Sequence, residues 1–184
     1  MGEAGLARFS AREVAKRIGY SIGTIYNVFG SHDALIAAIN SRTFGLWVEW
    51  LNRALAIGGS DRMAALVDGY FGFARAHPQL WHAIYDHHLP DGAMLSPEDQ
   101  AERGRLMELV VAEVAAALGE QAKEAVHTLA RSLVATVHGH CAFALSGAWA
   151  LMGESAPEAA ALARVREALG IGGSRAGLGR ASAP

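Results

Sequence analysis

The stretch "VAKRIGYSIGTIYNVFGS", residues 14–31, decides the fold, because it places three glycines and two serines inside sequence that otherwise favours helix. Glycine often takes the left-handed position that follows a helix, and serine is a strong N-cap residue. Gly19 is therefore predicted to end one short helix, and Ser21 to begin a second that runs to about residue 28 and ends at Gly30. The stretch predicts two short helices joined by a tight turn.

The inward faces of these helices follow from helical spacing. The first helix opens with Ser-Ala-Arg-Glu at residues 10–13, which has the form of a capping box. We expect Val14 and Ile18, four residues apart, to face inward in the first helix, and Ile25 and Phe29 in the second.

Small and polar residues occupy the outward face of the second helix. In a helix-turn-helix motif the second helix lies in the major groove of DNA and the first crosses the backbone. Gly23 would allow a close approach, Asn27 could read an adenine edge, and the N–H groups near Ser21 could bind a phosphate. Periodicity alone leaves a plain helical hairpin with a solvated face equally open. The DNA-contacting residues predicted on this basis are Arg12, Ser21, Ile22, Gly23, Thr24, Tyr26 and Asn27, with Lys16 and Arg17 adding charge.

The rest of the chain is also predicted to be helical. A long amphipathic helix is expected at about residues 32–57, with further helices at about 61–76, 78–86, 97–117, 121–147 and 156–169. Pro78 and Pro97 suit first turns, and Ser155 with Glu158 forms another capping-box pattern. Residues 87–95 are predicted to be a loop, and residues 170–184 a disordered tail.

Composition limits the class of protein. Of the 184 residues, 52% are hydrophobic, which is enough for a sizeable core, and the single Cys141 excludes an internal disulfide and fits a reducing cytoplasm. The formal charge is −2, but residues 1–57 carry six Arg or Lys against four Asp or Glu. No secretory signal and no apolar run long enough for a membrane span is recognised. These features predict a cytoplasmic, all-α protein with a mildly basic head.

Residue-level likeness narrows the function. The sequence "FSAREVAKRIGYSIGTIYNVFGSHDALI", residues 9–36, resembles the DNA-binding signature of the TetR-family transcriptional regulators. More loosely, "YFGFARAHPQLWHAIYD" (residues 70–86) and "LVATVHGHCAFALSG" (residues 133–147) resemble one C-terminal class of that family, named in part for a Trp-His-Gly helix. Val134 stands where that class usually has the tryptophan.

The resemblance implies a helix-turn-helix head at residues 1–45 and an effector-binding and dimerisation domain at residues 46–169. It implies a homodimer formed through helices at about 121–147 and 156–169, acting on a pseudo-palindromic operator, most often as a repressor released by a small apolar effector. It implies neither catalysis nor a cofactor. Ser10 and His32 join the predicted DNA contacts, His32 in place of the family's usual lysine.

The resemblance also implies a first helix that this sequence does not contain before residue 5. The expectation is a fragile head, because apolar side chains such as Ile18 and Phe29 would be poorly covered. A helical ligand-binding or scaffolding dimer that does not bind DNA is the alternative that this departure leaves open.

The body offers candidates for both of its implied roles. An i,i+4 stripe on the helix at 121–147 could pair with a second copy or form internal core: Val126, Leu129, Leu133, Val137, Cys141 and Leu145. The predicted effector pocket, apolar with a few polar groups, comprises Phe71, Trp81, Tyr85, Met107, His138 and Trp149. The histidines near residues 82–88 and 138–140 match no metal-binding spacing, so no metal site is predicted.

Overall fold

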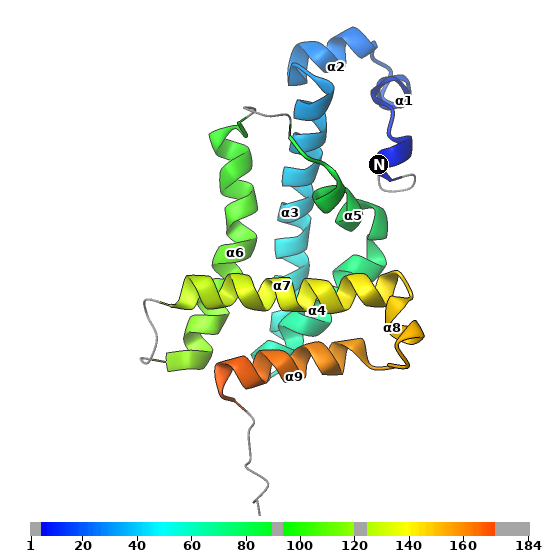
Figure 1. Cartoon of the computed structure of the whole chain (residues 1–184). Helices are drawn as coiled ribbons and strands as arrows, with labels where there is room; N and C mark the ends of the chain where they lie inside the picture. Colours follow the sequence, from blue (N-terminus) through cyan, green and yellow to red (C-terminus); the bar gives the residue numbers. More distant parts are fainter. Residues whose placement is uncertain (1–4, 90–93, 120–124, 172–184) are drawn as a thin grey trace, which may run out of the picture. The chain divides into compact units, whose positions relative to one another are not determined.

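The computed structural model describes residues 5–89, 94–119 and 125–171, and within these ranges every regular element is a helix. The predicted all-α fold is therefore confirmed. The chain divides into two compact units, residues 1–113 and residues 114–184. The elements are η1 (Leu6–Arg8), α1 (Ala11–Arg17), α2 (Ile22–Phe29), α3 (His32–Ile57), α4 (Arg62–Ala76), α5 (Pro78–Asp86), α6 (Pro97–Leu118), α7 (Val126–Leu145), α8 (Ala148–Leu151) and α9 (Pro157–Leu169) (Figure 1).

The first unit is organised around α3, a single helix of 26 residues. The α1–α2 pair lies at its N-terminal end, and α4 and α5 pack against its length (Figure 1). Aromatic side chains form the core there: the Trp47 ring stacks on Phe73 at 4.8 Å and contacts Tyr70 at 4.8 Å. The predicted domain boundary near residue 45 falls inside α3 and stays a prediction.

The second unit contains the α7–α9 pair, whose helices run side by side (Figure 1). Four members of the predicted stripe on α7 are buried within the single chain, namely Val126, Leu133, Val137 and Cys141. On α9 the buried residues are Ala161, Val165 and Leu169. The stripe is predicted either to pair with a second copy or to form internal core. These four side chains form internal core.

Helix ends follow the predicted proline and glycine positions with one exception. Pro78 and Pro97 each begin a helix, and Gly58 caps the C-terminus of α3. The capping box predicted at Ser155 is wrong, because α9 begins at Pro157 and its N-cap is Ala156, with no side-chain cap. The predicted tail, from residue 172 onward, and residues 90–93 and 120–124 lie outside the described residues. No helix of the described part is long and apolar enough to span a membrane.

Candidate nucleic-acid interface

The turn between α1 and α2 is built from serine caps and glycines, as the sequence predicts. The Ser10 hydroxyl accepts a hydrogen bond from the Glu13 N–H at 3.4 Å, and the Ser21 hydroxyl accepts one from the Thr24 N–H at 3.1 Å. Gly19 has a φ of +76°, in the left-handed region that favours glycine. The left-handed backbone at Gly19 thus ends α1, and the Ser21 side-chain cap fixes where α2 begins.

The core beneath the turn is small and differs in part from prediction. Ala11, Ala15, Ile25 and Leu35 are buried together, and Phe9, Ile22 and Ile39 pack against them in part. Ile25 confirms the predicted inward position. The prediction for α1 is wrong, since Val14 is only partly buried and Ile18 is 54% exposed. Ile18, the C-cap of α1, still donates its N–H to the Val14 carbonyl at 3.1 Å and so continues the helical turn, but the buried face of α1 is the one that carries Ala11 and Ala15. Phe29, also predicted to be inward, is 36% exposed.

The outward face of α2 carries the predicted polar side chains. Gly23, Tyr26 and Asn27 are exposed, whereas Thr24 is partly buried and shares a 3.0 Å hydrogen bond with the Ser21 hydroxyl. Ile22 is partly buried against the core, so only part of its side chain remains on the face. Exposed hydroxyl and amide groups on one helix face can bind phosphate oxygens or base edges.

Gly23 has no structural reason to be glycine. Its φ is not in the left-handed region, and a Cβ built there would meet only the Ser21 Oγ, at 3.5 Å, an ordinary contact. A glycine in a helix costs stability relative to alanine. The fold of the described chain therefore gives no reason for this residue, which is explained if a partner approaches the helix closely.

Positive charge lies on the elements beside α2. Arg12, Lys16 and Arg17 are exposed on α1, and Arg8 is exposed at the end of η1. Ser10 and His32 are exposed, as a residue that contacts DNA must be. The centroid of the His32 ring lies 5.7 Å from that of the Phe9 ring. Sequence reasoning missed Arg8 and the exposed Tyr20 in the turn, although their positions beside the motif were readable.

The predicted effector residues divide between the two units. In the first unit Trp81 and Tyr85 are in contact, with ring centroids 5.2 Å apart, Phe71 is buried, and Met107 is partly buried on α6. In the second unit His138 is partly buried, and the Trp149 ring lies 5.0 Å from the His140 ring. Of the six predicted effector residues, the structure thus shows a contact between two, Trp81 and Tyr85. The effector pocket stays a prediction.

Sequence reasoning missed two residues on α3 that each bury a polar atom without a hydrogen-bond partner among the described residues, Asn40 and Trp47. Asn40 donates from its amide nitrogen to the Ala83 carbonyl of α5 at 3.1 Å, while its amide oxygen has no hydrogen-bond partner among the described residues. The indole N–H of Trp47 is buried without an acceptor in the same described set. Their spacing of seven residues places both on one face of α3, and on that face Asn40 contacts α5 through Ala83.

A second polar link also joins α3 and the end of α5. The His87 Nε2 lies 3.3 Å from the Asp33 carboxylate, and the His87 side chain is nearly buried. Within the described ranges, no group of three or more His, Cys, Asp or Glu side chains is arranged to hold a metal ion.

Known proteins share both parts of this arrangement. The family profile for bacterial regulatory proteins of the tetR family matches residues 1–39, and that for the tetracyclin repressor-like C-terminal domain matches residues 63–168. A structure of a protein of unknown function from Rhodococcus sp. RHA1 superposes with a TM-score of 0.70 and 25% identity, over 91% of this chain and 86% of that one.

A second solved structure, SCO4313, described as a candidate regulatory protein, gives a TM-score of 0.69 at 22% identity, over 91% of this chain and 88% of its own; at that identity the likeness concerns the fold alone. No curated protein sequence matches significantly. The two profiles together cover most of the chain. The first of them spans α1 and α2, which form the helix-turn-helix. The chain belongs to the TetR family of DNA-binding transcriptional regulators, which are not enzymes.

Proposed function

We propose that this regulator acts in the cytoplasm as a homodimeric repressor that binds a pseudo-palindromic operator and is released by a small apolar effector. The observation that carries the DNA-binding part is Gly23, an exposed helix glycine that the fold itself does not require. Its neighbours Tyr26 and Asn27 are exposed on the same helix, where they can contact base edges or phosphates.

The remaining predicted contacts fit a supporting role around that face. Ser10 and Ser21 cap their helices through their oxygen atoms. The Ser10 hydroxyl keeps a proton to donate to a phosphate, and the Ser21 hydroxyl does so when Thr24 is the donor in the hydrogen bond that the two share. Arg12 is exposed on α1, where its charge contributes to affinity without reading sequence, and His32 is exposed on α3, where its ring N–H can donate to a phosphate. We assign base readout to Tyr26 and Asn27 and phosphate positioning to the others.

The exposed side of α7 supports the homodimer. Because the hydrophobic stripe on α7 is already buried in one chain, a second copy would have to use other residues. Thr128, Ser132 and Ala135 are exposed, and a Cβ at Gly139 would meet nothing within 4 Å. These residues recur at alternating spacings of four, three and four, as in helices packed along a common seam. We propose that this small-residue face, together with α9, forms the dimer contact.

Two contacts support coupling between effector and operator. Asn40 on α3 binds the Ala83 carbonyl of α5, and Asp33 at the start of α3 contacts His87 at the end of α5. Since α5 also carries Trp81 and Tyr85, a ligand that moves α5 would act directly on the helix leading to the head. By linkage, the operator would weaken effector binding by the same factor as the effector weakens operator binding.

The test begins with an operator selected from a pool of random DNA duplexes by the full chain. Fluorescence anisotropy at two salt concentrations then measures binding of that duplex. We expect Asn27→Ala to weaken binding about 5- to 150-fold, the range of a lost base contact, and Tyr26→Phe by about 3- to 10-fold. Asn52→Ala, at an exposed position of α3 outside the head, is the matched control and should bind like the unchanged chain.

Each outcome bears on a different part of the proposal. Unchanged binding by both Tyr26→Phe and Asn27→Ala would refute this recognition face. Failure to select any duplex, with a dimer still seen by sedimentation, would favour a ligand-binding dimer that does not bind DNA. A monomer that still binds one half-site would refute the proposed dimer alone.

A further inference from the structure

A groove in the first unit lies apart from both the recognition face and the predicted effector residues. Its volume is about 670 Å³, and it is lined by the end of α2, the first two turns of α3, and the segment that leads into α6. Pockets of this size hold small organic molecules. None of the predicted effector residues lines it.

The groove presents apolar side chains that little else in the unit covers. Val28 is 71% exposed, Met94 is 86% exposed, and the partly exposed Phe29 lies beside them in the lining. Ala38 and Leu89 extend this apolar surface. Contact with an apolar ligand would remove such surface from water, which is favourable in proportion to the area covered.

Every charged residue in the lining is acidic. Asp33, Glu98, Asp99 and Glu102 line the groove, and among the described residues no Lys, Arg or His does so. The site therefore attracts positive charge and repels negative charge over the short range that salt leaves unscreened.

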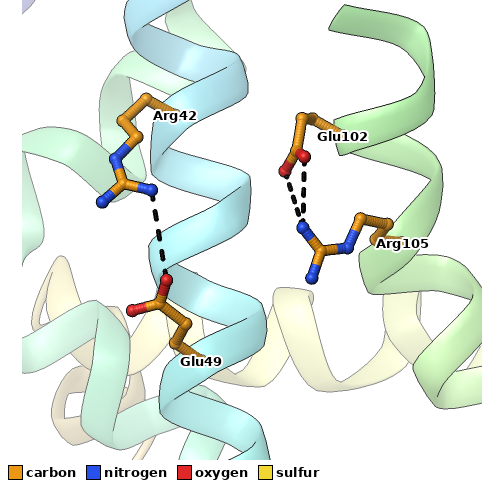
Figure 2. Close-up of polar contacts among 4 residues, drawn as sticks. All are labelled: Arg42, Glu49, Glu102 and Arg105. Carbon is orange, nitrogen blue, oxygen red and sulfur yellow. Dashed lines mark hydrogen bonds and ion pairs between the residues drawn. The ribbon is translucent and has the colours of Figure 1, made fainter. Parts of the chain in front are cut away.

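Three of these carboxylates are held in place by neighbours. Asp33 contacts His87, Asp99 accepts a hydrogen bond from the Ser96 hydroxyl at 2.9 Å, and Glu102 pairs with Arg105 at 3.1 Å on the side of α6 that faces α3 (Figure 2). The Glu102 Oε2 would lie 3.2 Å from a Cβ at Gly45, so this side chain reaches from α6 to the backbone of α3.

Glu98 differs from the other three, because it is exposed and has no ion pair within the described residues. It stands in the first turn of α6, where the Ser96 oxygen accepts the Asp99 N–H at 3.0 Å and fixes the start of the helix. A carboxylate without an ion pair, beside apolar side chains, is the complement of a molecule that combines positive charge with apolar groups.

We propose that this groove binds an amphipathic organic cation, with its charge beside Glu98 and its apolar groups against Val28, Phe29 and Met94. The inference does not depend on DNA binding or on the effector proposed above. Because Val28 and Phe29 belong to α2, the bound cation would touch the same helix that carries Tyr26 and Asn27.

The test uses tetraphenylphosphonium and tetraphenylborate, which have nearly the same shape and apolar area but opposite charge. Calorimetric titration of the full chain should show binding of the phosphonium and about tenfold weaker binding of the borate, since the unpaired Glu98 carboxylate attracts the cation about threefold and repels the anion about threefold. Methyl NMR signals of Val28, Ala38 and Met94 should shift as the phosphonium binds.

Glu98→Gln should weaken phosphonium binding about threefold or more, as expected for losing one charge at roughly 6 Å in a highly solvated site. Glu108→Gln removes the same charge from an exposed position of α6 that does not line the groove, and should leave binding unchanged. Equal affinity for the borate, equal weakening by both variants, or methyl shifts confined to other residues would each overturn the proposal.

Discussion

Replacing Gly23 with alanine should change stability and DNA affinity in opposite directions. Gly23 is the second residue of α2, and the added Cβ would meet only the Ser21 Oγ, at 3.5 Å. Alanine gains up to about 1 kcal/mol over glycine inside a helix, and a position in the first turn should give the lower end, about 0.5 kcal/mol. For a chain of this size, that gain raises the melting temperature by about 1–2 °C.

The DNA-binding side of the prediction comes from distance. A methyl group at residue 23 would hold the DNA backbone about 1.5 Å farther from the helix. A donor–acceptor distance of about 2.9 Å would then become too long for a hydrogen bond. Losing one hydrogen bond to a charged phosphate costs about 1.5–3 kcal/mol, so operator affinity should fall about 10- to 150-fold. Calorimetric melting of the chain and anisotropy with the selected duplex measure the two effects separately.

Gly104→Ala provides the matched control. Gly104 lies within α6, away from α2, and its Cβ would lie 4.0 Å from the Glu108 Oε1, so alanine should stabilise the chain without affecting DNA binding. If Gly23→Ala stabilised the chain but bound the operator normally, no partner approaches closely at residue 23. The reasoning that the glycine serves a partner would then be refuted.

Four further results are expected. Gly19→Ala should destabilise the head by about 1–2 kcal/mol, since its φ of +76° is strained for any residue with a Cβ, and chemical denaturation will measure this. Ser21→Ala should cost about 1 kcal/mol through loss of the cap to the Thr24 N–H, seen as faster amide exchange in α2, whereas unchanged exchange would contradict the capping role. Asn40→Ala should cost about 1–3 kcal/mol in denaturant, because it removes a buried hydrogen bond to the Ala83 carbonyl. Amides of α1 and α2 should exchange faster than those of α3, because the head core is small, and equal protection would show that the head is not fragile.

Sequence reasoning succeeded where one residue decides local geometry. Gly19, Ser21 and Pro78 each fix a helix end through their own backbone or hydroxyl chemistry, so their roles do not depend on distant partners. The second capping box failed because Pro157 took the first helical position, which moved the N-cap of α9 from the expected Ser155 to Ala156.

Inward and outward faces were harder to predict in short helices. In α1 both Ala11 with Ala15 and Val14 with Ile18 satisfy the same i,i+4 spacing, and hydrophobicity favoured the wrong pair. Small alanines let α1 and α2 approach closely, which the larger side chains would not. On α7 the apolar stripe was readable, but its burial within one chain was not, since that depends on contact with α9.

The candidate sites show the same division. The exposed face of α2 was readable because one helix carries it, from Gly23 to Asn27. The contact between Asn40 and Ala83 joins residues 43 positions apart, and that between Asp33 and His87 joins residues 54 positions apart. No short-range sequence pattern predicts such contacts. The groove likewise depends on how the segment before α6 meets α2 and α3.

The continuity of α3 has a mechanical consequence. A helix of 26 residues at about 1.5 Å per residue is about 39 Å long, and no glycine cap or proline interrupts it. For a rigid helix of this length, a tilt of about 5° around one end displaces the other by about 3.4 Å. That displacement equals about one base-pair step along a DNA strand, enough to move a recognition helix out of register with its site.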